Sequence, residues 1–313
     1  MSAMLTILAV PKAFEGHFGL IQRNAARSWA RLEPPPEIIL FGNDPGTAEM
    51  AAEVGARHVP DIAVSPAGAP MLDDLLARGQ ELARGRVVCF VNADIILTPA
   101  WMRAVQTAAA WRPRFLMVGR RWNFDLLEPL DLSTPAWAEE LVARAQREGK
   151  QASNMFIDYF VFPRGLLTEI PPFVIGRPGY DNWLLWRARR RGIALVDASA
   201  AAPVVHQNHD YAHIKANRGD PGGMQTYLKG EDTRRNGQLA GDWTHFYTSD
   251  HATHVMTDQG VQLALARRYL DARVDLVKRH VINVTRPLRR KVGLDFNVWK
   301  RVRAWTAGRS SSS

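Results

Sequence analysis

The segment from residue 87 to residue 99, VVCFVNADIILTP, most constrains how this chain can fold. An apolar run leads into a polar turn that contains Asp94, and a second apolar run follows before Thr98 and Pro99 begin an expected helix. A short apolar run bounded by turn residues is typical of a strand buried on both faces of a parallel sheet. Ligands of such sheets bind beyond the carboxyl ends of the strands, so Asp94 is placed to hold a ligand or a cation. A solvated turn is the other interpretation, since Asp is common in turns.

Strand and helix patterns alternate along the first part of the chain. Strands are expected at residues 5–10, 37–41, 57–59 and 115–118, with helices at 19–32, 47–54, 70–84 and 99–110. This alternation is typical of an α/β fold with a mainly parallel sheet and right-handed crossovers. In the second half the patterns predict helices at 135–148 and 184–191 and strands at 154–162, 193–196 and 203–205. Residues 212–258 are rich in Gly, Asp, Asn and Thr and lack apolar periodicity, which predicts a long mobile loop.

The composition is that of a globular protein, with 46% hydrophobic residues among 313. The single cysteine, Cys89, excludes an intramolecular disulfide and favours the cytoplasm. No uncharged apolar run approaches about 18 residues, so no transmembrane helix is expected. The apolar start at residues 4–10 lacks a basic region and a cleavage site, and is interpreted as a first strand rather than a signal peptide.

Positive charge is concentrated at the C-terminal end of the chain. Residues 262–313 contain 13 Lys or Arg and 3 Asp or Glu, so they carry a net charge of +10 while the rest carries −1. Apolar residues recur at helical spacing here, and Trp299 and Trp305 lie among basic residues. Such helices suit an anionic membrane surface on the inner face of the membrane. Packing on the globular part is the alternative. No nucleic-acid partner is expected, because no binding motif accompanies the charge.

Residues 90–97, FVNADIIL, resemble the metal-binding turn of GT-A fold glycosyltransferases of the family 2 type, in which a strand ends in an Asp-x-Asp motif. Here Asn92 stands where the first Asp usually lies. The resemblance implies that Asn92 contacts the ribose of a nucleotide and that Asp94 binds a divalent metal, Mn²⁺ or Mg²⁺. It also implies a GT-A, Rossmann-like fold with a mainly parallel sheet flanked by helices, to which a basic helical C-terminal appendage is added.

The resemblance divides the chain into a nucleotide-sugar-binding half at 1–118, an acceptor-binding and catalytic half at 119–260 with the mobile loop 212–258, and a basic amphipathic helical tail at 261–313. In the first half, Pro11 and Lys12 follow the first strand and would lie by the base or diphosphate of the donor. Asp44 follows the second strand and would contact the base or ribose. A plain turn before Pro45 is the alternative for Asp44.

Asp181 lies at the start of the helix expected around residues 184–191. Helix capping alone explains an acid at this position. In the resembled family, inverting enzymes keep their catalytic carboxylate at the start of such a helix, commonly as an acidic pair. Here the second member of the pair is Asn182, so Asp181 is the candidate catalytic base.

Three further residues are candidates for binding the acceptor. Asp158 interrupts an apolar strand, and an unpaired buried carboxylate is costly. It is therefore either hydrogen-bonded within the protein or directed at the acceptor. Tyr180 and Trp183 flank Asp181 and are placed to stack on a sugar ring.

Two histidines follow the strand expected at residues 203–205. A lone histidine is more often structural, but His206 and His209 lie close together with Asp210 adjacent, and imidazole with carboxylate is a common set of transition-metal ligands. The resemblance implies a late histidine ligand to the metal, for which His206 is the first choice and His209 the second. A nitrogen ligand favours manganese over magnesium.

These features together predict a metal-dependent glycosyltransferase that moves a sugar from a nucleotide-diphosphate donor to a hydroxyl acceptor. Inversion is the expected outcome, with retention still open, and a carbohydrate or lipid-linked acceptor in surface polysaccharide or glycolipid synthesis is expected. One alternative is a non-catalytic carbohydrate- or nucleotide-binding protein on the same fold, which Asn92 and Asn182 favour. The other is a sugar nucleotidyltransferase, although the Gly-rich loop of such enzymes is missing after the first strand.

Overall fold

The computed structural model describes residues 4–209 and 230–264, together with Val274 and Val277. The chain divides into two compact units, Met1–Tyr269 and Leu270–Ser313, and all elements below belong to the first. The predicted tail helices lie outside the described residues, as do residues 212–229 of the predicted loop. Within the described residues, no helix combines the length and the apolar character needed to cross a membrane.

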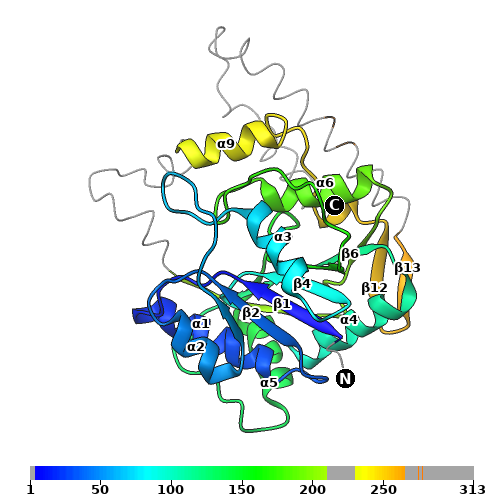
Figure 1. The fold of residues 1–313 in the computed structure, drawn as a ribbon. Helices are drawn as coiled ribbons and strands as arrows, with labels where there is room; N and C mark the ends of the chain where they lie inside the picture. The colour runs from blue at the N-terminus through cyan, green and yellow to red at the C-terminus, as the bar shows by residue number, and fades with distance from the viewer. Residues whose placement is uncertain (1–3, 210–229, 265–273, 275–276, 278–313) are drawn as a thin grey trace, which may run out of the picture. The chain divides into compact units, whose positions relative to one another are not determined.

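The first unit is built on a nine-stranded sheet with the order β13-β12-β10-β6-β9-β4-β1-β2-β3. Its strands are β1 (Leu5–Ala9), β2 (Glu37–Phe41), β3 (Arg57–Val59), β4 (Val87–Val91), β6 (Phe115–Val118), β9 (Tyr159–Pro163), β10 (Ala194–Asp197), β12 (His254–Thr257) and β13 (Gly260–Leu263). All neighbours are parallel except at β9, which runs antiparallel between β4 and β6, and at the edge strand β13. The predicted α/β fold with a mainly parallel sheet is confirmed (Figure 1).

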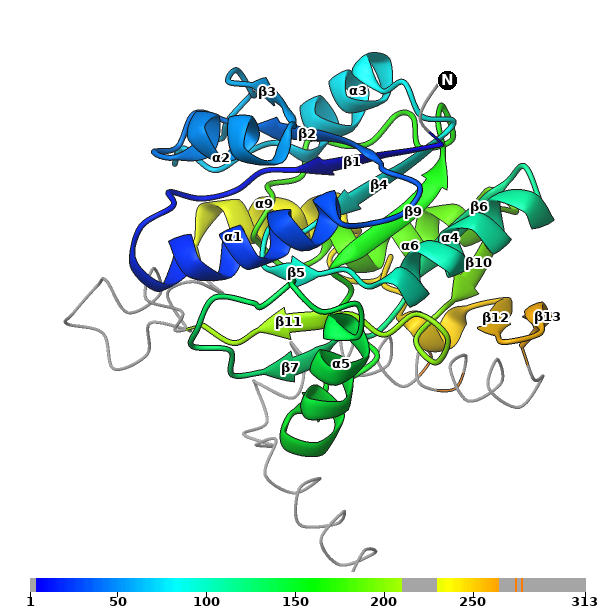
Figure 2. The ribbon, with the colours of Figure 1, turned by 90° about the horizontal axis from the view of Figure 1, so that it is seen from below.

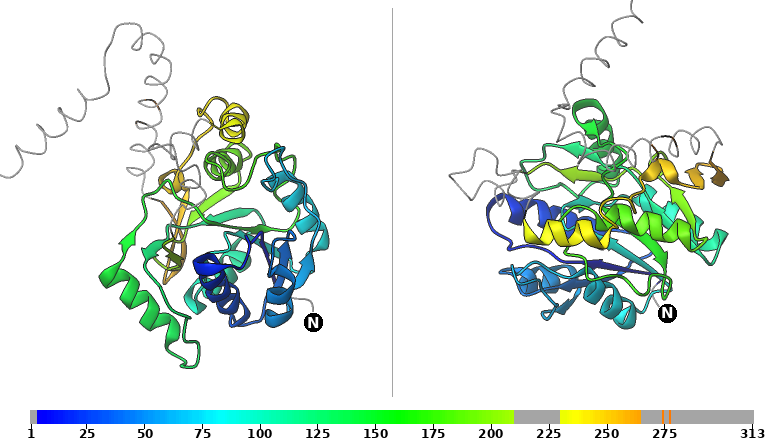
Figure 3. Two further views of the ribbon diagram at one scale, coloured as in Figure 1. Left: turned by 90° about the vertical axis from the view of Figure 1, so that its left-hand side faces the viewer. Right: turned by 90° about the horizontal axis from the view of Figure 1, so that it is seen from above.

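Helices cover both faces of this sheet. The helices α1 (Gly16–Ala30), α2 (Thr47–Val54) and α4 (Pro99–Trp111) pack on one face, and α3 (Leu72–Leu82) and α6 (Tyr180–Arg190) pack on the other. A further helix, α9 (Glu231–Leu239), lies on the same face as α3 and α6 (Figure 1, Figure 3). Side chains alternate along each strand, so Ile7 and Cys89 pack under α1 and α4 while Leu8 and Val88 pack under α3 and α6.

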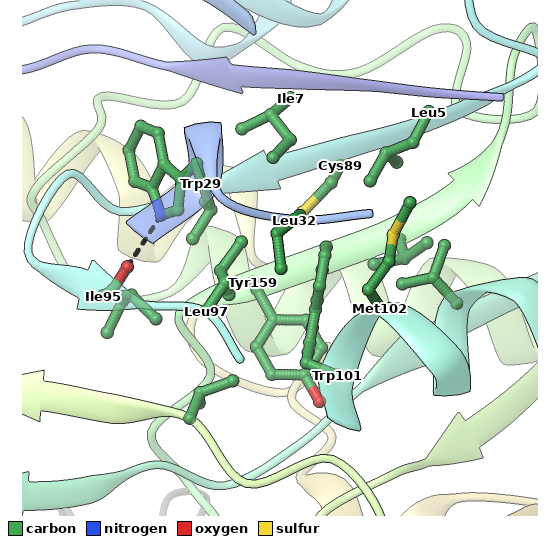
Figure 4. Close-up of a cluster of buried hydrophobic side chains, with 14 of the residues drawn as sticks. Leu5, Ile7, Trp29, Leu32, Cys89, Ile95, Leu97, Trp101, Met102 and Tyr159 are labelled. Carbon is green, nitrogen blue, oxygen red and sulfur yellow. Dashed lines mark hydrogen bonds between the residues drawn. The ribbon is translucent and has the colours of Figure 1, made fainter. Parts of the chain in front are cut away.

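Two buried tryptophans fix α1 and α4 to the sheet (Figure 4). The indole nitrogen of Trp29 donates a hydrogen bond of 2.8 Å to the carbonyl oxygen of Ile95, and the ring of Trp101 meets Tyr159 edge-on at 5.9 Å. Most buried indole N–H groups have such a partner, whereas among the described residues that of Trp101 has none. The bond from Trp29 therefore anchors the segment that follows β4 beneath α1.

A second, four-stranded sheet begins where β4 ends. It has the order β5-β11-β7-β8, from β5 (Ile95–Ile96), β11 (Val205–Gln207), β7 (Trp122–Phe124) and β8 (Lys150–Gln151), and α5 (Trp137–Glu148) covers it (Figure 2). The chain passes from the large sheet to the small one through residues 92–94. The turn that contains Asp94 is thus the junction of the two sheets.

The structure differs from the sequence-based expectation in several elements. The short strands β5, β7, β8 and β13 were not expected, and β11 begins two residues later than the strand expected at residues 203–205. The strand β9 begins at Tyr159 rather than at residue 154, and α6 begins at Tyr180 rather than at residue 184, because Gly179 with φ of 113° ends the loop before it. The prediction of a loop is wrong for residues 230–258, which contain α9, a 3₁₀ turn η1 (Ser249–His251) and β12. Periodicity missed α9 because the buried face of this helix is polar, with Thr233 and Asn236 among its buried residues.

Candidate active site at the junction of the two sheets

Polar side chains gather at the edge of the large sheet where β1, β2, β4 and β6 end. Because β9 is antiparallel to β4 and β6, its amino end lies at the same edge, and α6 also begins there. The residues that these segments bring to the edge are Lys12, Asp44, Asn92, Asp94, Arg121, Asp158 and Asp181, several of which act electrostatically on one another. The structure thus gathers most of the predicted site residues on one edge.

Asp94, His206 and His209 form the most compact group at this edge. The strand β11 runs antiparallel to β5 with His206 opposite Ile95, and this register brings His206 beside Asp94. The Nε2 atoms of His206 and His209 lie 3.5 Å and 3.2 Å from Oδ2 of Asp94. One potential ligand atom from each residue lies within 4.8 Å of the others. The sequence favoured His206 over His209, but the two lie at nearly equal distances from Asp94.

Gln207 holds this group in place and was missed by the sequence analysis. Its side chain is fully buried and donates to the carbonyl oxygens of Ile21 at 2.7 Å and Asp94 at 3.2 Å. Its own oxygen accepts a bond of 2.9 Å from Asn24 of α1. The sequence shows Gln207 only as a polar residue between the two histidines, which does not indicate the backbone groups to which it is hydrogen-bonded.

The chemistry of this group fits a divalent metal. Among the described residues, Oδ1 of Asp94 and Nδ1 of His206 are buried without a hydrogen-bond partner, which is uncommon for buried polar atoms. Burial on its own raises the pKa of Asp94. The two histidines and Arg121 outweigh burial and hold the pKa of this carboxyl well below its usual range, so it is an anion at neutral pH. A carboxylate with two imidazoles suits a divalent transition-metal ion.

Lys12 places a positive charge beside this group. Its backbone exchanges hydrogen bonds of 2.7 Å and 2.9 Å with the side chain of Gln22, and its ammonium nitrogen lies 4.9 Å from the centre of the Phe18 ring. Burial lowers the pKa of Lys12, Asp94 and Asp44 raise it, and Arg177 lowers it further. Arg177, in the loop before α6, is therefore a second cation near Lys12 that the sequence analysis did not identify.

Asp158 is paired inside the protein. It is 6% exposed, accepts a hydrogen bond of 2.8 Å from the side-chain amide of Asn92 and forms an ion pair with the buried Arg121. The Arg121 guanidinium also lies 5.3 Å from the centre of the Phe156 ring. Of the two interpretations of Asp158, the hydrogen-bonded one is therefore observed, and acceptor binding stays a prediction. The sequence did not identify Arg121 as its partner.

Asp181 lies in the first turn of α6. Within the part of the chain that the structure describes, no cationic side chain is hydrogen-bonded to it. Its Oδ1 accepts a bond of 3.3 Å from the backbone amide of Gly179. Burial raises the pKa of Asp181 to about 7, backbone amides including that of Asn182 oppose the rise, and the charge of Asp158 adds to it. A carboxyl that titrates near neutral pH is well matched to proton transfer.

The remaining predicted residues lie in ordinary structural roles. Tyr180 and Trp183 are 6% and 4% exposed, and their rings pack against Phe90 at 6.2 Å and Phe173 at 5.2 Å. Core packing accounts for both, and stacking on a sugar stays a prediction. Asp44 is exposed in a turn closed by the bond of 3.1 Å from Thr47 N to its carbonyl, and Pro11 is buried after β1. Donor contacts for Asp44 and Pro11 also stay predictions.

No family model and no curated protein matches the sequence. Among solved structures, the chain is similar to a mycobacterial protein (18% identity over 78% of this chain and 75% of that chain, TM-score 0.45). It is also similar to glucosyl-3-phosphoglycerate synthase from Mycobacterium tuberculosis (17% identity over 76% of this chain and 81% of that chain, TM-score 0.43). A structure of that synthase with Mn²⁺, UDP and glucosyl-3-phosphoglycerate has 20% identity over 68% of this chain and 75% of that chain, with a TM-score of 0.42. Such low values transfer no ligand or activity to this chain.

Proposed function

We propose that the protein is a metal-dependent glycosyltransferase that moves a sugar from a nucleotide-diphosphate donor to a hydroxyl acceptor, with inversion at the anomeric carbon. The observation that carries the proposal is the group of Asp94, His206 and His209 beside Lys12, at the same edge of the sheet as a carboxyl with a pKa of about 7. A cation-binding group and a separate proton acceptor are what sugar transfer from a diphosphate requires.

On the donor side, Asp94, His206 and His209 would hold the metal, which supplies Lewis-acid neutralisation of the leaving diphosphate. Lys12 and Arg177 act electrostatically on each other, so two further positive charges are close together there. Fixed positive charges stabilise the negative charge that develops on a leaving group. The side-chain amide oxygen of Asn92 and the exposed Asp44 are the proposed contacts to the ribose and base.

On the acceptor side, Asp181 is the proposed general base. The acceptor hydroxyl transfers its proton to the Asp181 carboxylate as its oxygen forms the bond to the anomeric carbon and the diphosphate leaves. A pKa of about 7 lets the carboxylate be populated at neutral pH while remaining basic enough to accept the proton. A surface polysaccharide or glycolipid acceptor, and contact of the tail with a membrane, stay predictions.

A binding protein without turnover is the second candidate. Asn182, which stands in the place of a second acid, favours it: its side chain donates to the carbonyl oxygens of Tyr247 at 2.8 Å and of Met155 at 3.4 Å, which leaves it a structural role. In this alternative the donor site would bind nucleotide and Asp181 would only cap α6.

The test is thermal stabilisation of the purified protein by UDP, GDP, ADP and CDP, each with and without Mn²⁺, for the wild type and Asp94→Ala. We expect one nucleotide to raise Tm only with the metal, and the variant to lose this shift because Asp94 contacts both histidines. The matched control is Asp131→Ala, which removes an exposed Asp outside this group.

The selected nucleotide then defines the sugar donors to be assayed for transfer. Turnover with any of them excludes the binding-protein alternative. Absence of a shift with every nucleotide in the wild type would contradict the donor site, and an equal shift in Asp94→Ala would contradict the metal group.

A further inference from the structure

Asn236 of α9 bridges that helix to the loop in front of α6. The residue is fully buried, its Oδ1 accepts a bond of 2.8 Å from the Val174 amide, and its Nδ2 donates to the Val174 carbonyl at 3.0 Å. The same Nδ2 lies 3.3 Å from the carbonyl oxygens of Arg177 and Pro178. One side chain thus satisfies much of the backbone of residues 174–178, a loop whose Pro178 has no amide hydrogen to donate.

The turn after α9 has an unusual backbone. Asp242 and Trp243 adopt φ of 51° and 68°, a region that bulky residues rarely occupy unless the surroundings require it. A Cβ atom added to Gly179 would lie 3.0 Å from the Trp243 ring, and one added to Gly237 would lie 2.7 Å from it. The indole therefore fills the space that two glycines leave open, one in α9 and one directly before α6.

Both α9 and the chain after it are tied to the rest of the unit. Asp232 in the first turn of α9 accepts a bond of 3.1 Å from the Ser65 hydroxyl, and both residues are buried. Beyond Trp243, the Tyr247 amide donates to the Asn182 carbonyl at 3.1 Å. The amino end of α6 is thus held by contacts on both sides of Trp243.

We infer that Asn236 and Trp243 are positioning residues that fix the first turn of α6, and with it Asp181, at the edge where Asp94 lies. The inference rests on the proposed function and deepens it. Asn236 reaches the backbone up to Pro178, Trp243 packs on Gly179, and Asp181 lies two residues further along the chain. Directional bonds and a rigid ring set an orientation, whereas apolar packing alone would permit the loop to shift.

The first variant is Asn236→Asp, which keeps the size of the side chain and the acceptor for the Val174 amide. The carboxylate oxygen that replaces Nδ2 faces three carbonyl oxygens and repels them. We expect kcat to fall about 100-fold, because a displacement of about 1 Å at a reacting group has an effect of this size. Stabilisation by nucleotide with Mn²⁺ should fall less than kcat does, since Asp94, His206 and His209 lie on other segments and Arg177 is the donor-side residue in the loop that Asn236 contacts.

Gln80→Glu is the matched control. Gln80 also bridges a helix to a loop, accepting from the Gly165 amide at 2.9 Å and donating to the Leu167 carbonyl at 2.7 Å, but it does so at the opposite edge of the sheet, after β9. The same amide-to-carboxylate change there should leave kcat within about twofold of the wild type. Because Asn236 is fully buried and Gln80 only half-buried, a purely structural role of Asn236 predicts a lower Tm for Asn236→Asp with kcat per folded molecule unchanged.

The second variant, Gly237→Ala, acts through Trp243 without changing any hydrogen bond of Asn236. The added methyl group would overlap the indole and displace it from Gly179. We expect kcat to fall at least about tenfold. The acid limb of the kcat profile should also move to lower pH, because Asp181 becomes more exposed and its pKa, raised by burial, falls.

Hydrogen exchange in the peptide that covers residues 174–182 gives a readout that does not need turnover. We expect faster exchange in Asn236→Asp and Gly237→Ala, and none of this change in Gln80→Glu. Unchanged kcat in both variants, or lower kcat with unchanged exchange and an unmoved acid limb, would overturn the inference. Absence of any nucleotide shift in the wild type would instead overturn the proposed function, and the two failures are therefore distinguishable.

Discussion

Asp94 and Asp181 are carboxylates at the same edge of the same sheet, and their surroundings move their pKa values in opposite directions. Both are partly shielded from water, which raises the pKa of a carboxyl. Asp94 has two imidazoles and Arg121 close by, and its pKa falls well below the usual range. Burial raises the pKa of Asp181 to about 7, backbone amides oppose the rise and the negative charge of Asp158 adds to it. Burial thus raises the pKa of both carboxyls, and only Asp94 has cationic neighbours that outweigh it.

Asp158 lies between these two cases. Like Asp94 it has a cationic partner, Arg121, and like Asp181 it is at the amino end of an element rather than after a parallel strand. Its charge is paired with the Arg121 guanidinium within the protein. Three aspartates at one edge thus have three different sets of neighbours.

The largest effect is expected from Asp181→Asn. The change removes the proposed proton acceptor while keeping the shape of the side chain and its bond to the Gly179 amide. We expect kcat to fall about 10²–10⁴-fold, the range that general base catalysis supplies. Nucleotide-dependent stabilisation should be unchanged. Steady-state kinetics and thermal shift on the same preparation measure both.

Asp131→Asn, which changes an exposed residue outside the candidate site residues, is the control for Asp181→Asn. If Asp181→Asn loses nucleotide binding along with turnover, the distinction between the donor-side and acceptor-side carboxylates breaks, and Asp181 would belong to the donor site.

Arg121→Met should make Asp158 resemble Asp181 by leaving it buried without its cation. Removing one partner of a buried ion pair destabilises a protein by about 3–5 kcal/mol. We expect a loss of this size in urea unfolding at pH 7.

The control for this variant is Arg144→Met. Arg144 is exposed and also lies over an aromatic ring, at 5.3 Å from the centre of Phe124. Its replacement should cost less than about 1 kcal/mol, as expected for an exposed site. A loss of similar size in both variants would mean that stacking, and not the charge of Asp158, accounts for the effect of Arg121.

The histidines distinguish Asp94 from the other two aspartates. His206→Asn and His209→Asn should each weaken Mn²⁺ binding at least about tenfold in calorimetric titration, because each removes one nitrogen ligand and even the loss of an outer-shell partner costs about 10–100-fold. His254→Asn, on β12, is the control and should leave the affinity unchanged. Equal affinity in His209→Asn and the wild type would limit the ligand set to Asp94 and His206.

The last comparison is the pH dependence of the wild type, which needs no variant. The carboxylate of Asp181 is the active form, so kcat should fall about tenfold for each pH unit below about 7 and level off above it. Asp181→Asn should show no such limb in its residual rate. A wild-type profile that is flat from pH 5 to pH 8 would contradict the assignment of Asp181 as the base.

The sequence predicted the parallel strands and the turn with Asp94 because their causes are local. The apolar run of β4 and the polar residues after it are adjacent in the chain, and Asp181 likewise announces the start of α6. The proximity of His206 to Asp94 was expected from the resemblance alone. Physically it depends on the register of β11 against β5, and these strands are far apart in sequence.

The other contacts could not be predicted because both partners are polar and distant in sequence. Nothing in the residues around Arg121 indicates that it would meet Asp158, and nothing around Asn236 indicates the backbone of residues 174–178. The antiparallel direction of β9 could not be predicted either, because its apolar run fits a strand of either direction. Hydrophobic patterns report burial, whereas such contacts require the register and direction of chains that only the folded structure defines.

The pairing of β5 with β11 links metal binding to the stability of the small sheet. Asp94 directly precedes β5 and His206 lies within β11, so opening this pair of strands would separate the two proposed ligands. A metal that binds only the paired state adds RT ln(1 + [M]/Kd) to the free energy of that opening. The large sheet contributes no histidine to the group, so metal binding would not stabilise that sheet against local opening. Local hydrogen exchange in β5 and β11 would then act as a gauge of the free Mn²⁺ concentration around the protein.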